Sequence, residues 1–353
     1  MRALTVVPGR AGSLDVTEVA DRTAGADELL VDGVAVGVCG TDHEIVRGEH
    51  GAPPPGHERL VLGHESLGRV REAPAGCGFE PGDLVVGVVR RPDPVPCGAC
   101  AHGEWDMCRN GLFTEHGIKE VDGFAAEQWT VAADHAVRLD PSLGDLGVLL
   151  EPTSIVTKAW DQVDRIGGRA WFDPQRVLVT GAGPIGLLAA LVGVQRGLDV
   201  HVLDQVSDGP KPDLVRALGA TYHQQDLPTV ADRIEPDVIV ECTGAPSVVV
   251  DTFTSTRPYG ITVLTGVSSA GRHVPVDAGA ANRSVVLEND VIVGSVNANL
   301  AHYRAGAEVL ARADREWLAG LVTRRVPLDR ATEAFEPHQD DVKVVLDLGR
   351  PRG

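Results

Sequence analysis

The hydrophobic pattern divides the chain into two kinds of segment. Up to about residue 150, short apolar runs such as 29–36 and 84–89 alternate with turn signals rich in Gly, Pro and Asp, as at 80–83. Apolar runs of this length, bounded by such residues, are typical of β-strands. We therefore predict a barrel-like, mostly β domain in this part of the chain.

From Glu151 onward, strand-like and helical stretches alternate. The pattern predicts helices over 153–163 and 184–196, and buried strands over 176–180, 200–204, 238–241 and 261–265. This alternation is typical of a parallel, doubly wound sheet. After about residue 300 the pattern predicts helix, and then a last strand over 343–347 that returns to the first domain. The fold class is thus α/β, with one domain of 1–155 completed by 300–353, and another of 156–299.

Length and charge narrow the class of protein. The 353 residues suit two domains better than one core, and no stretch reaches the roughly 18 apolar residues of a membrane span. A formal net charge of −18 argues against nucleic acid or an anionic membrane as a partner. The N-terminus lacks the apolar region of a secretory signal, so we expect a cytoplasmic location.

A glycine-rich turn follows the predicted strand 176–180. Gly181, Gly183 and Gly186 have the spacing that receives the pyrophosphate of a dinucleotide. Pro184 and Ile185 open the following helix, whose N-terminus offers N–H donors and a favourable dipole to the phosphates. This context favours a dinucleotide site over a structural turn.

The next predicted strand bears on the choice of dinucleotide. Asp204 is placed to accept hydrogen bonds from the adenosine ribose and to repel a 2′-phosphate. Gln205 stands where an NADP enzyme would favour arginine, so NAD is preferred, while Lys211 keeps NADP open. Other residues expected at the ligand-binding edge of the sheet are Thr243, Gly266 and Val267.

A second group of chemically distinctive residues lies in the first domain. Cys39 stands at the end of a predicted strand, and His64 and Glu65 are adjacent in the segment 62–65. A thiolate, an imidazole and a carboxylate are the ligands that a catalytic zinc takes, with one position left open. A lone cysteine or histidine is more often structural. Combined with the dinucleotide turn, the set indicates a dehydrogenase that oxidises alcohols.

The order Cys-Gly-Thr-Asp-His, Gly-His-Glu-x-x-Gly, a cysteine-rich lobe and Gly-x-Gly-x-x-Gly resembles that of the medium-chain zinc-dependent alcohol dehydrogenase family. The segments most similar to its glucose 1-dehydrogenase branch are 39–48, 60–65, 88–92, 115–118, 150–152 and 293–297. The resemblance implies a GroES-like catalytic domain, a Rossmann nucleotide-binding domain, and a homodimer or homotetramer.

The resemblance also implies the ligands of the catalytic zinc. Cys39 and His64 would hold the metal. Glu65 would contact the metal directly, or would contact a metal ligand rather than the metal itself. Glu151 would reach the metal directly or through water.

Further residues would serve the substrate. Thr41 would pass the proton of the alcohol toward His43 or solvent. Glu115, Glu151 and Asn297 would hydrogen-bond sugar hydroxyls, and Asn297 would also contact the cofactor.

The cysteine-rich lobe indicates a structural zinc held by Cys97, Cys100 and Cys108. Close spacing of cysteines in a long chain without an export signal signals metal more often than disulfide. The family pattern has one more cysteine where this chain has proline. Asp93 is the leading fourth ligand because a carboxylate can complete a tetrahedral site. The alternatives are His102, Glu104, and a lobe that has lost its metal.

These observations predict oxidation of a cyclic aldose, first of all D-glucose, at C1 to the aldonolactone, with hydride transfer to NAD or NADP. The nearest alternative is a dehydrogenase of another sugar, polyol or cyclitol on the same scaffold. A non-catalytic dinucleotide-binding relative and a zinc-free quinone reductase are disfavoured, because neither needs Cys39, His64 and Glu65.

Overall fold

The computed structural model describes residues 1–269 and 271–349, and its chain divides into two compact units. Unit 1 comprises Met1–Ser154 and Ala298–Gly353, and unit 2 comprises Ile155–Asn297. Within the described ranges, none of the helices combines the length and hydropathy that a membrane crossing requires.

Unit 1 is built on a seven-stranded sheet of order β11-β6-β5-β3-β19-β18, in which β10 also pairs with β3. The strands of this sheet are β3 (Glu28–Val38), β5 (Glu65–Glu72), β6 (Leu84–Gly87), β10 (Gln128–Ala132), β11 (Ala136–Arg138), β18 (Val322–Pro327) and β19 (Lys343–Asp347). Two three-stranded sheets are formed by β1 (Arg2–Val6), β2 (Asp15–Glu18) and β4 (Leu60–Val61), and by β7 (Arg90–Arg91), β8 (Thr114–His116) and β9 (Glu120–Val121). The prediction of a β-rich first domain is confirmed.

The helices of unit 1 lie at the ends of its strands and in its C-terminal segment. They are α1 (Gly40–Val46), α2 (Gly98–Ala101), the start of α3 (Leu150–Gly167), α9 (Leu300–Arg312) and α10 (Arg315–Leu321), with 3₁₀ helices at Trp105–Met107, Ala133–His135, Pro141–Leu149 and Leu328–Phe335. Helix α3 begins three residues before the predicted start at 153, so that Glu151 lies in its first turn.

One prediction about the C-terminal segment was wrong. The chain after residue 300 was expected to be helical up to the last strand, whereas the strand β18 lies between helix α10 and the last strand, β19. β18 is an edge strand that pairs in parallel with β19. Its two arginines interrupt the apolar pattern and so hide the strand in the sequence. In the structure, Arg324 pairs with Asp341 and Arg325 with Asp347.

The C-terminal strand completes the core of unit 1. Val344 and Leu346 of β19 belong to the same buried cluster as Leu29 and Val31 of β3. β19 pairs antiparallel with β3, where Leu346 lies opposite Val36. The first and last parts of the chain therefore depend on each other for a common core.

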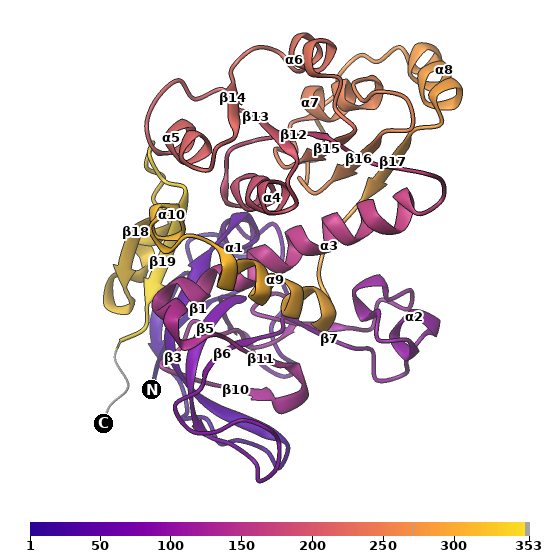
Figure 1. Cartoon of the computed structure of the whole chain (residues 1–353). Helices are drawn as coiled ribbons and strands as arrows, with labels where there is room; N and C mark the ends of the chain where they lie inside the picture. The colour runs from indigo at the N-terminus through magenta and orange to yellow at the C-terminus, as the bar shows by residue number, and fades with distance from the viewer. Residues whose placement is uncertain (270, 350–353) are drawn as a thin grey trace. The chain divides into compact units, whose positions relative to one another are not determined.

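Unit 2 contains a six-stranded, entirely parallel sheet of order β14-β13-β12-β15-β16-β17. Its strands are β12 (Arg176–Thr180), β13 (Asp199–Leu203), β14 (Thr221–His223), β15 (Val238–Glu241), β16 (Ile261–Leu264) and β17 (Val291–Gly294). Its helices are the rest of α3, α4 (Pro184–Gln195), α5 (Pro210–Ala217), α6 (Leu227–Ile234), α7 (Pro246–Asp251) and α8 (Ala278–Glu288), with a 3₁₀ helix at Thr252–Thr254. Figure 1 shows α4 and α5 on one side of the sheet, and α6 and α7 on the other.

The strand order reverses at β12. From β12 the chain proceeds outward to β13 and β14, and then returns to β15 on the opposite side of β12. In doubly wound sheets, ligands bind at the carboxyl ends of the strands beside such a reversal. The doubly wound prediction is confirmed, and the glycine-rich turn at the end of β12 lies at this position.

We expect Leu346→Ala to lower the free energy of unfolding by about 2–5 kcal/mol, because the substitution leaves a cavity in the core. The Leu346 side chain is 1% exposed, whereas that of Leu112 is 63% exposed. Leu112→Ala is therefore the control, with an expected change within about 0.5 kcal/mol. Urea unfolding of both variants provides the measurement. Equal stability of the two would contradict the role of β19 in the core.

Candidate zinc centres and dinucleotide site

Cys39 and His64 meet at the start of α1. Cys39 follows β3 and precedes α1 directly, while His64 lies between β4 and β5. The distance from Cys39 Sγ to His64 Nε2 is 3.0 Å. Gly63 has a φ of +88°, and a Cβ there would lie 2.7 Å from a methyl carbon of Val36. The absence of a side chain thus lets the His64 segment pack closely against β3.

Asp42 contacts both residues through its carboxylate. Its Oδ2 accepts a hydrogen bond from the Cys39 N–H at 3.0 Å, and its Oδ1 lies 3.4 Å from His64 Nδ1. Burial disfavours the carboxylate, yet the His64 ring and the Cys39 N–H lower the pKa of Asp42. A carboxylate at Nδ1 leaves Nε2 to face Cys39, as in metal-binding histidines. Sequence analysis missed Asp42, although its position three residues after Cys39 is a helix-capping position.

Glu65 is paired with a buried lysine. Lys343 of β19 is 1% exposed and donates hydrogen bonds to the Glu65 carboxylate and to Val38 O. Burial opposes the charge of the ammonium, but Glu65 and Cys39 outweigh it and raise the pKa of Lys343. This pairing favours a position of Glu65 behind the ligands over direct ligation. Lys343 was also missed, although a lysine within the apolar run 342–346 is an unusual signal.

Glu151 lies close to the same group of side chains. It is 7% exposed in the first turn of α3. Burial raises the pKa of Glu151 to about 7, with a lowering contribution from His64 and a raising one from Glu65. A metal cation at this place would stabilise the ionised carboxylate.

Thr41 and His43 lie on α1, beyond Cys39. Both are partly exposed. The His43 ring packs edge-on against Phe335, with 5.2 Å between ring centroids. Burial lowers the pKa of His43, which the Asp42 charge opposes. A neutral His43 can accept a proton.

The donor atoms of this cluster fit zinc. Cys39, His64 and Glu65 each offer a ligand atom, and these atoms lie within 4.8 Å of one another. A tetrahedral zinc with ordinary bond lengths separates sulfur and nitrogen ligands by about 3.5 Å. Burial lowers the pKa of His64, but Cys39 and Asp42 outweigh this effect and raise it well above its usual range. The fit to zinc therefore rests on the ligand types and on the spacing of the donor atoms.

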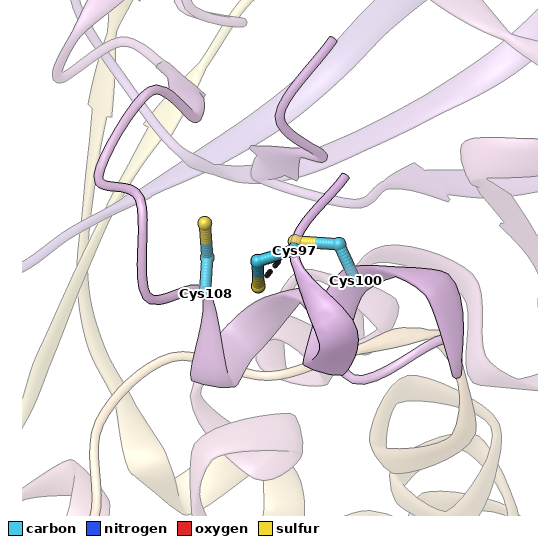
Figure 2. A group of neighbouring side chains, drawn as sticks. All are labelled: Cys97, Cys100 and Cys108. Carbon is cyan, nitrogen blue, oxygen red and sulfur yellow. Dashed lines mark hydrogen bonds between the residues drawn. The ribbon is translucent and has the colours of Figure 1, made fainter. Parts of the chain in front are cut away.

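The three cysteines of the lobe converge from two short helical segments (Figure 2). Cys97 Sγ lies 3.6 Å from Cys100 Sγ, and the three sulfurs lie within 4.8 Å of one another. Backbone N–H groups, that of Arg109 first, lower the pKa of Cys97 to about 6. A readily formed thiolate beside two further thiols fits a structural zinc.

Among the suggested fourth ligands of the lobe, Asp93 lies beside the cysteines. It is 4% exposed, and its Oδ2 is 4.0 Å from Cys108 Sγ. Its Oδ1 accepts a hydrogen bond from Val95 N–H at 2.8 Å. His102 is exposed, and its Nδ1 lies 2.7 Å from Gly98 O. The geometry therefore favours Asp93 over His102.

Glu115 belongs to a buried ion pair on β8. Its Oε1 accepts hydrogen bonds from Arg90 Nε at 3.1 Å and Nη2 at 3.0 Å. Arg90 also donates to Asp106 O at 3.1 Å and stacks over the ring of Phe113. Glu115 is thus a fixed, buried carboxylate. Asn297 belongs to unit 2, follows β17, and has a left-handed backbone with φ of +63°.

The glycine-rich turn has the close packing that its spacing predicts. Gly181 has a φ of +89°, and a Cβ at Gly186 would collide with Gly181 O. Gly183 caps α4, whose first turn contains Pro184 and Ile185. Apart from the chain directly around Gly183, no atom of the described residues lies within 4 Å of its Cβ position, which leaves room for the approach of a ligand.

Asp204 follows β13 directly, one residue beyond the strand that was predicted to include it. Its Oδ2 accepts a hydrogen bond from Ala182 N–H at 2.7 Å, and its Oδ1 accepts one from Val206 N–H at 3.1 Å. Lys211 Nζ lies 3.9 Å from Oδ2, and Gln205 is exposed. Asp204 thus fixes the glycine-rich turn as well as facing the end of β13.

Glu241 organises the same edge of the sheet and was not predicted as a site residue. This fully buried carboxylate accepts hydrogen bonds from Thr243 N–H at 2.7 Å and from Gly244 N–H at 3.1 Å. A Cβ at Gly266 would lie 2.7 Å from Glu241 Oε2, and Val267 is 76% exposed. A glutamate that ends the apolar strand β15 was the available signal.

The β-rich unit with a Cys-His-Glu cluster, and the parallel unit with a dinucleotide turn, together define a zinc-type dehydrogenase architecture. Residues 25–141 match the family model described as alcohol dehydrogenase GroES-like domain, and residues 144–348 match that described as glucose dehydrogenase C-terminus.

Known relatives narrow this class. Glucose 1-dehydrogenase of Methanocella arvoryzae is 37% identical to this chain and covers 99% of it and 100% of its own length. Glucose 1-dehydrogenase 2 of Vulcanisaeta moutnovskia is 39% identical over 99% of each chain. The structure of Haloferax mediterranei glucose dehydrogenase in complex with NADP, Zn and gluconolactone has a TM-score of 0.91 at 33% identity, covering 99% of this chain and 100% of that one. The chain belongs to the glucose 1-dehydrogenase branch of the medium-chain zinc-dependent alcohol dehydrogenase family.

We expect Asp42→Asn to weaken zinc binding at the Cys39–His64 cluster about 10- to 100-fold, because the variant loses the charge that orients His64. Competition with a chelator measures the affinity, and circular dichroism tests whether the variant folds. Glu49→Gln, which changes an exposed carboxylate shortly after the end of α1, serves as the control. The zinc affinity of the cysteine lobe should not change in either variant. An unchanged affinity of the cluster in Asp42→Asn would contradict the orienting role of Asp42.

Proposed function

We propose that this chain oxidises D-glucose, in its cyclic form, at C1 to gluconolactone, with hydride transfer to NAD or NADP. The observation that carries the proposal is the Cys39–His64–Glu65 cluster in a chain that also contains a dinucleotide turn. Identity of 37–39% with glucose 1-dehydrogenases along 99% of the chain supports glucose as the substrate.

In this proposal, Cys39 and His64 hold the zinc, Glu151 completes the site directly or through water, and Glu65 stays paired with Lys343. Zinc bound there would supply a Lewis acid that lowers the pKa of a C1 hydroxyl. Burial and the nearby Glu65 carboxylate raise the pKa of Glu151, and a cation bound beside Glu151 would favour its ionised form.

The proton and the sugar are handled by neighbouring residues. The Thr41 hydroxyl accepts the proton of the C1 hydroxyl and passes it toward His43 or solvent. Burial lowers the pKa of His43, which favours the neutral ring that can accept a proton. Glu115, Glu151 and Asn297 hydrogen-bond the other sugar hydroxyls. Specificity follows because an analogue that lacks one hydroxyl loses a hydrogen bond to one of these buried or fixed polar groups.

The dinucleotide lies over the glycine-rich turn in this proposal, and its nicotinamide is the hydride acceptor. NAD is preferred because the Asp204 carboxylate repels a 2′-phosphate. Lys211, 3.9 Å from that carboxylate, offsets part of the repulsion and supports use of NADP as the second candidate. Gln205, Thr243, Gly266 and Val267 would line this dinucleotide site.

The cysteine lobe would hold a structural zinc through Cys97, Cys100, Cys108 and Asp93.

We also propose a homodimer or homotetramer. In support, unit 2 exposes apolar side chains in and before α8, with Val286 and Leu287 both 63% exposed. Burial of such side chains against a second copy would be favourable. A cytoplasmic location stays a prediction.

We expect the zinc-loaded protein to form reduced nicotinamide with D-glucose, and to do so faster with NAD than with NADP at low cofactor concentration. Cys39→Ala and His64→Ala should abolish turnover because each removes a zinc ligand. Absorbance at 340 nm over a panel of aldoses, polyols and cyclitols is the measurement. Activity on a cyclitol or polyol without activity on any aldose would contradict the glucose assignment and favour the alternative dehydrogenase.

We expect Glu115→Gln to raise the KM for glucose about tenfold or more, since a hydrogen bond to a charged group contributes about 1.5–3 kcal/mol. The KM for the dinucleotide should change little. The control is Glu120→Gln, an exposed carboxylate on the paired strand β9. Steady-state kinetics with varied glucose gives both constants. A kcat loss at unchanged KM would contradict a role of Glu115 in sugar binding.

A further inference from the structure

A hollow lies in unit 2 along β14, the edge strand of the parallel sheet. It has a volume of about 580 Å³, and its lining includes His201, Arg216, Tyr222, His223 and Arg233. Arg216 belongs to α5, and Arg233 belongs to α6. The described residues that line the hollow include no carboxylate, although the chain has a net charge of −18.

The two histidines and Arg233 form a directed chain of hydrogen bonds. Arg233 Nη2 lies 2.9 Å from His223 Nδ1, and His223 Nε2 lies 2.8 Å from His201 Nδ1. A guanidinium can only donate, so His223 Nδ1 accepts and His223 Nε2–H donates to His201. His201 Nε2–H then faces Asp199 Oδ2 at 3.3 Å.

This series of hydrogen bonds keeps the positive charge on Arg233. Burial, together with His201 and Arg233, lowers the pKa of His223 to about 4. His201 and His223 are both buried, whereas Arg233 is exposed. The neutral His223 ring therefore orients Arg233 without sharing its charge.

Arg216 provides the second guanidinium, over the ring of Tyr222 at 5.9 Å. Its carboxylate partner, Asp213, is 3.0 Å away, but that ion pair is more than half exposed on both sides. Exposed ion pairs contribute little free energy and exchange readily. Arg216 can thus turn to a ligand of higher charge.

We propose that this hollow binds a phosphate-bearing anion between Arg216 and Arg233, at a place distinct from the glycine-rich turn. Guanidinium groups form paired, charge-assisted hydrogen bonds with phosphate oxygens. The side chain of Gln224, also in the lining, adds a further amide donor.

The walls of the hollow are connected to the dinucleotide turn. His223 O accepts the N–H of Asp204 at 3.1 Å, and Gln224 Nε2 donates to Val206 O at 3.1 Å. Asp204 in turn holds Ala182 of the glycine-rich turn. An anion that shifts β14 would therefore alter dinucleotide affinity. Only this coupling rests on the proposed function.

Calorimetric titration with pyrophosphate tests the site, in protein saturated with NADH so that the glycine-rich turn is filled. We expect a dissociation constant at or below the millimolar range, and at least tenfold weaker binding in Arg233→Gln and in Arg216→Gln. Arg233→Lys should retain part of the affinity because it keeps the charge. Arg283→Gln, an exposed arginine on α8, is the matched control and should bind as the wild type does.

Inorganic phosphate and AMP, titrated in the same way, distinguish a site for the phosphate alone from one for a nucleotide. Histidine NMR should show a rise in the pKa of His223 when pyrophosphate binds, because the anion offsets the charge of Arg233. Absence of binding up to about 10 mM, or equal binding in Arg233→Gln and Arg283→Gln, would overturn the proposal.

The coupling is measured as the dissociation constant of NADH with and without pyrophosphate, with at least a twofold change expected in the wild type and none in Arg233→Gln. Equal constants in the wild type would overturn the coupling. Failure of NADH to bind would count against the proposed function. In that case, pyrophosphate binding that depends on Arg233 would still support the site.

Discussion

Compensation of buried charge is the constraint on which unit 1 depends. Asp42, His64, Glu65 and Lys343 are each at most 5% exposed, and an uncompensated charge at any of these places would be strongly destabilising. Asp42 faces His64, and Lys343 faces Glu65. The second pair also links β19 to β5, so the C-terminal strand contributes a charge to the candidate zinc centre as well as apolar side chains to the core.

Unit 2 satisfies its buried carboxylates in a different way. Glu241 and Asp204 accept hydrogen bonds from backbone N–H groups of the loops that follow the strands, among them those of Thr243 and Ala182. Backbone donors, rather than a buried partner such as Lys343, hold these carboxylates, although Lys211 Nζ also lies 3.9 Å from Asp204 Oδ2. These hydrogen bonds also fix the loop conformations at the carboxyl edge of the sheet. The same residue type thus supports a metal cluster in one unit and positions ligand-binding loops in the other.

The sequence was sufficient to predict those elements whose patterns are local. The alternation of apolar strands and helices after Glu151 was sufficient to predict the doubly wound sheet, and the spacing of the glycines after 176–180 was sufficient to predict the dinucleotide turn. β18 escaped prediction because its arginines are neutralised by Asp341 and Asp347, which are distant in the sequence. An edge strand need bury only part of its surface, so its apolar pattern is weak.

The same distinction applies to the candidate zinc centre. Cys39 and His64 are each ordinary alone, but together with Glu65 and the dinucleotide turn they form a combination of ligand types whose chemistry is visible in the sequence. Asp42 and Lys343 have many possible uses, and only the fold shows that they face His64 and Glu65. Because a partner that hydrogen-bonds a metal-binding side chain orients it and tunes its basicity, we expect zinc affinity at this centre to depend on Asp42 and Lys343 as well as on Cys39 and His64.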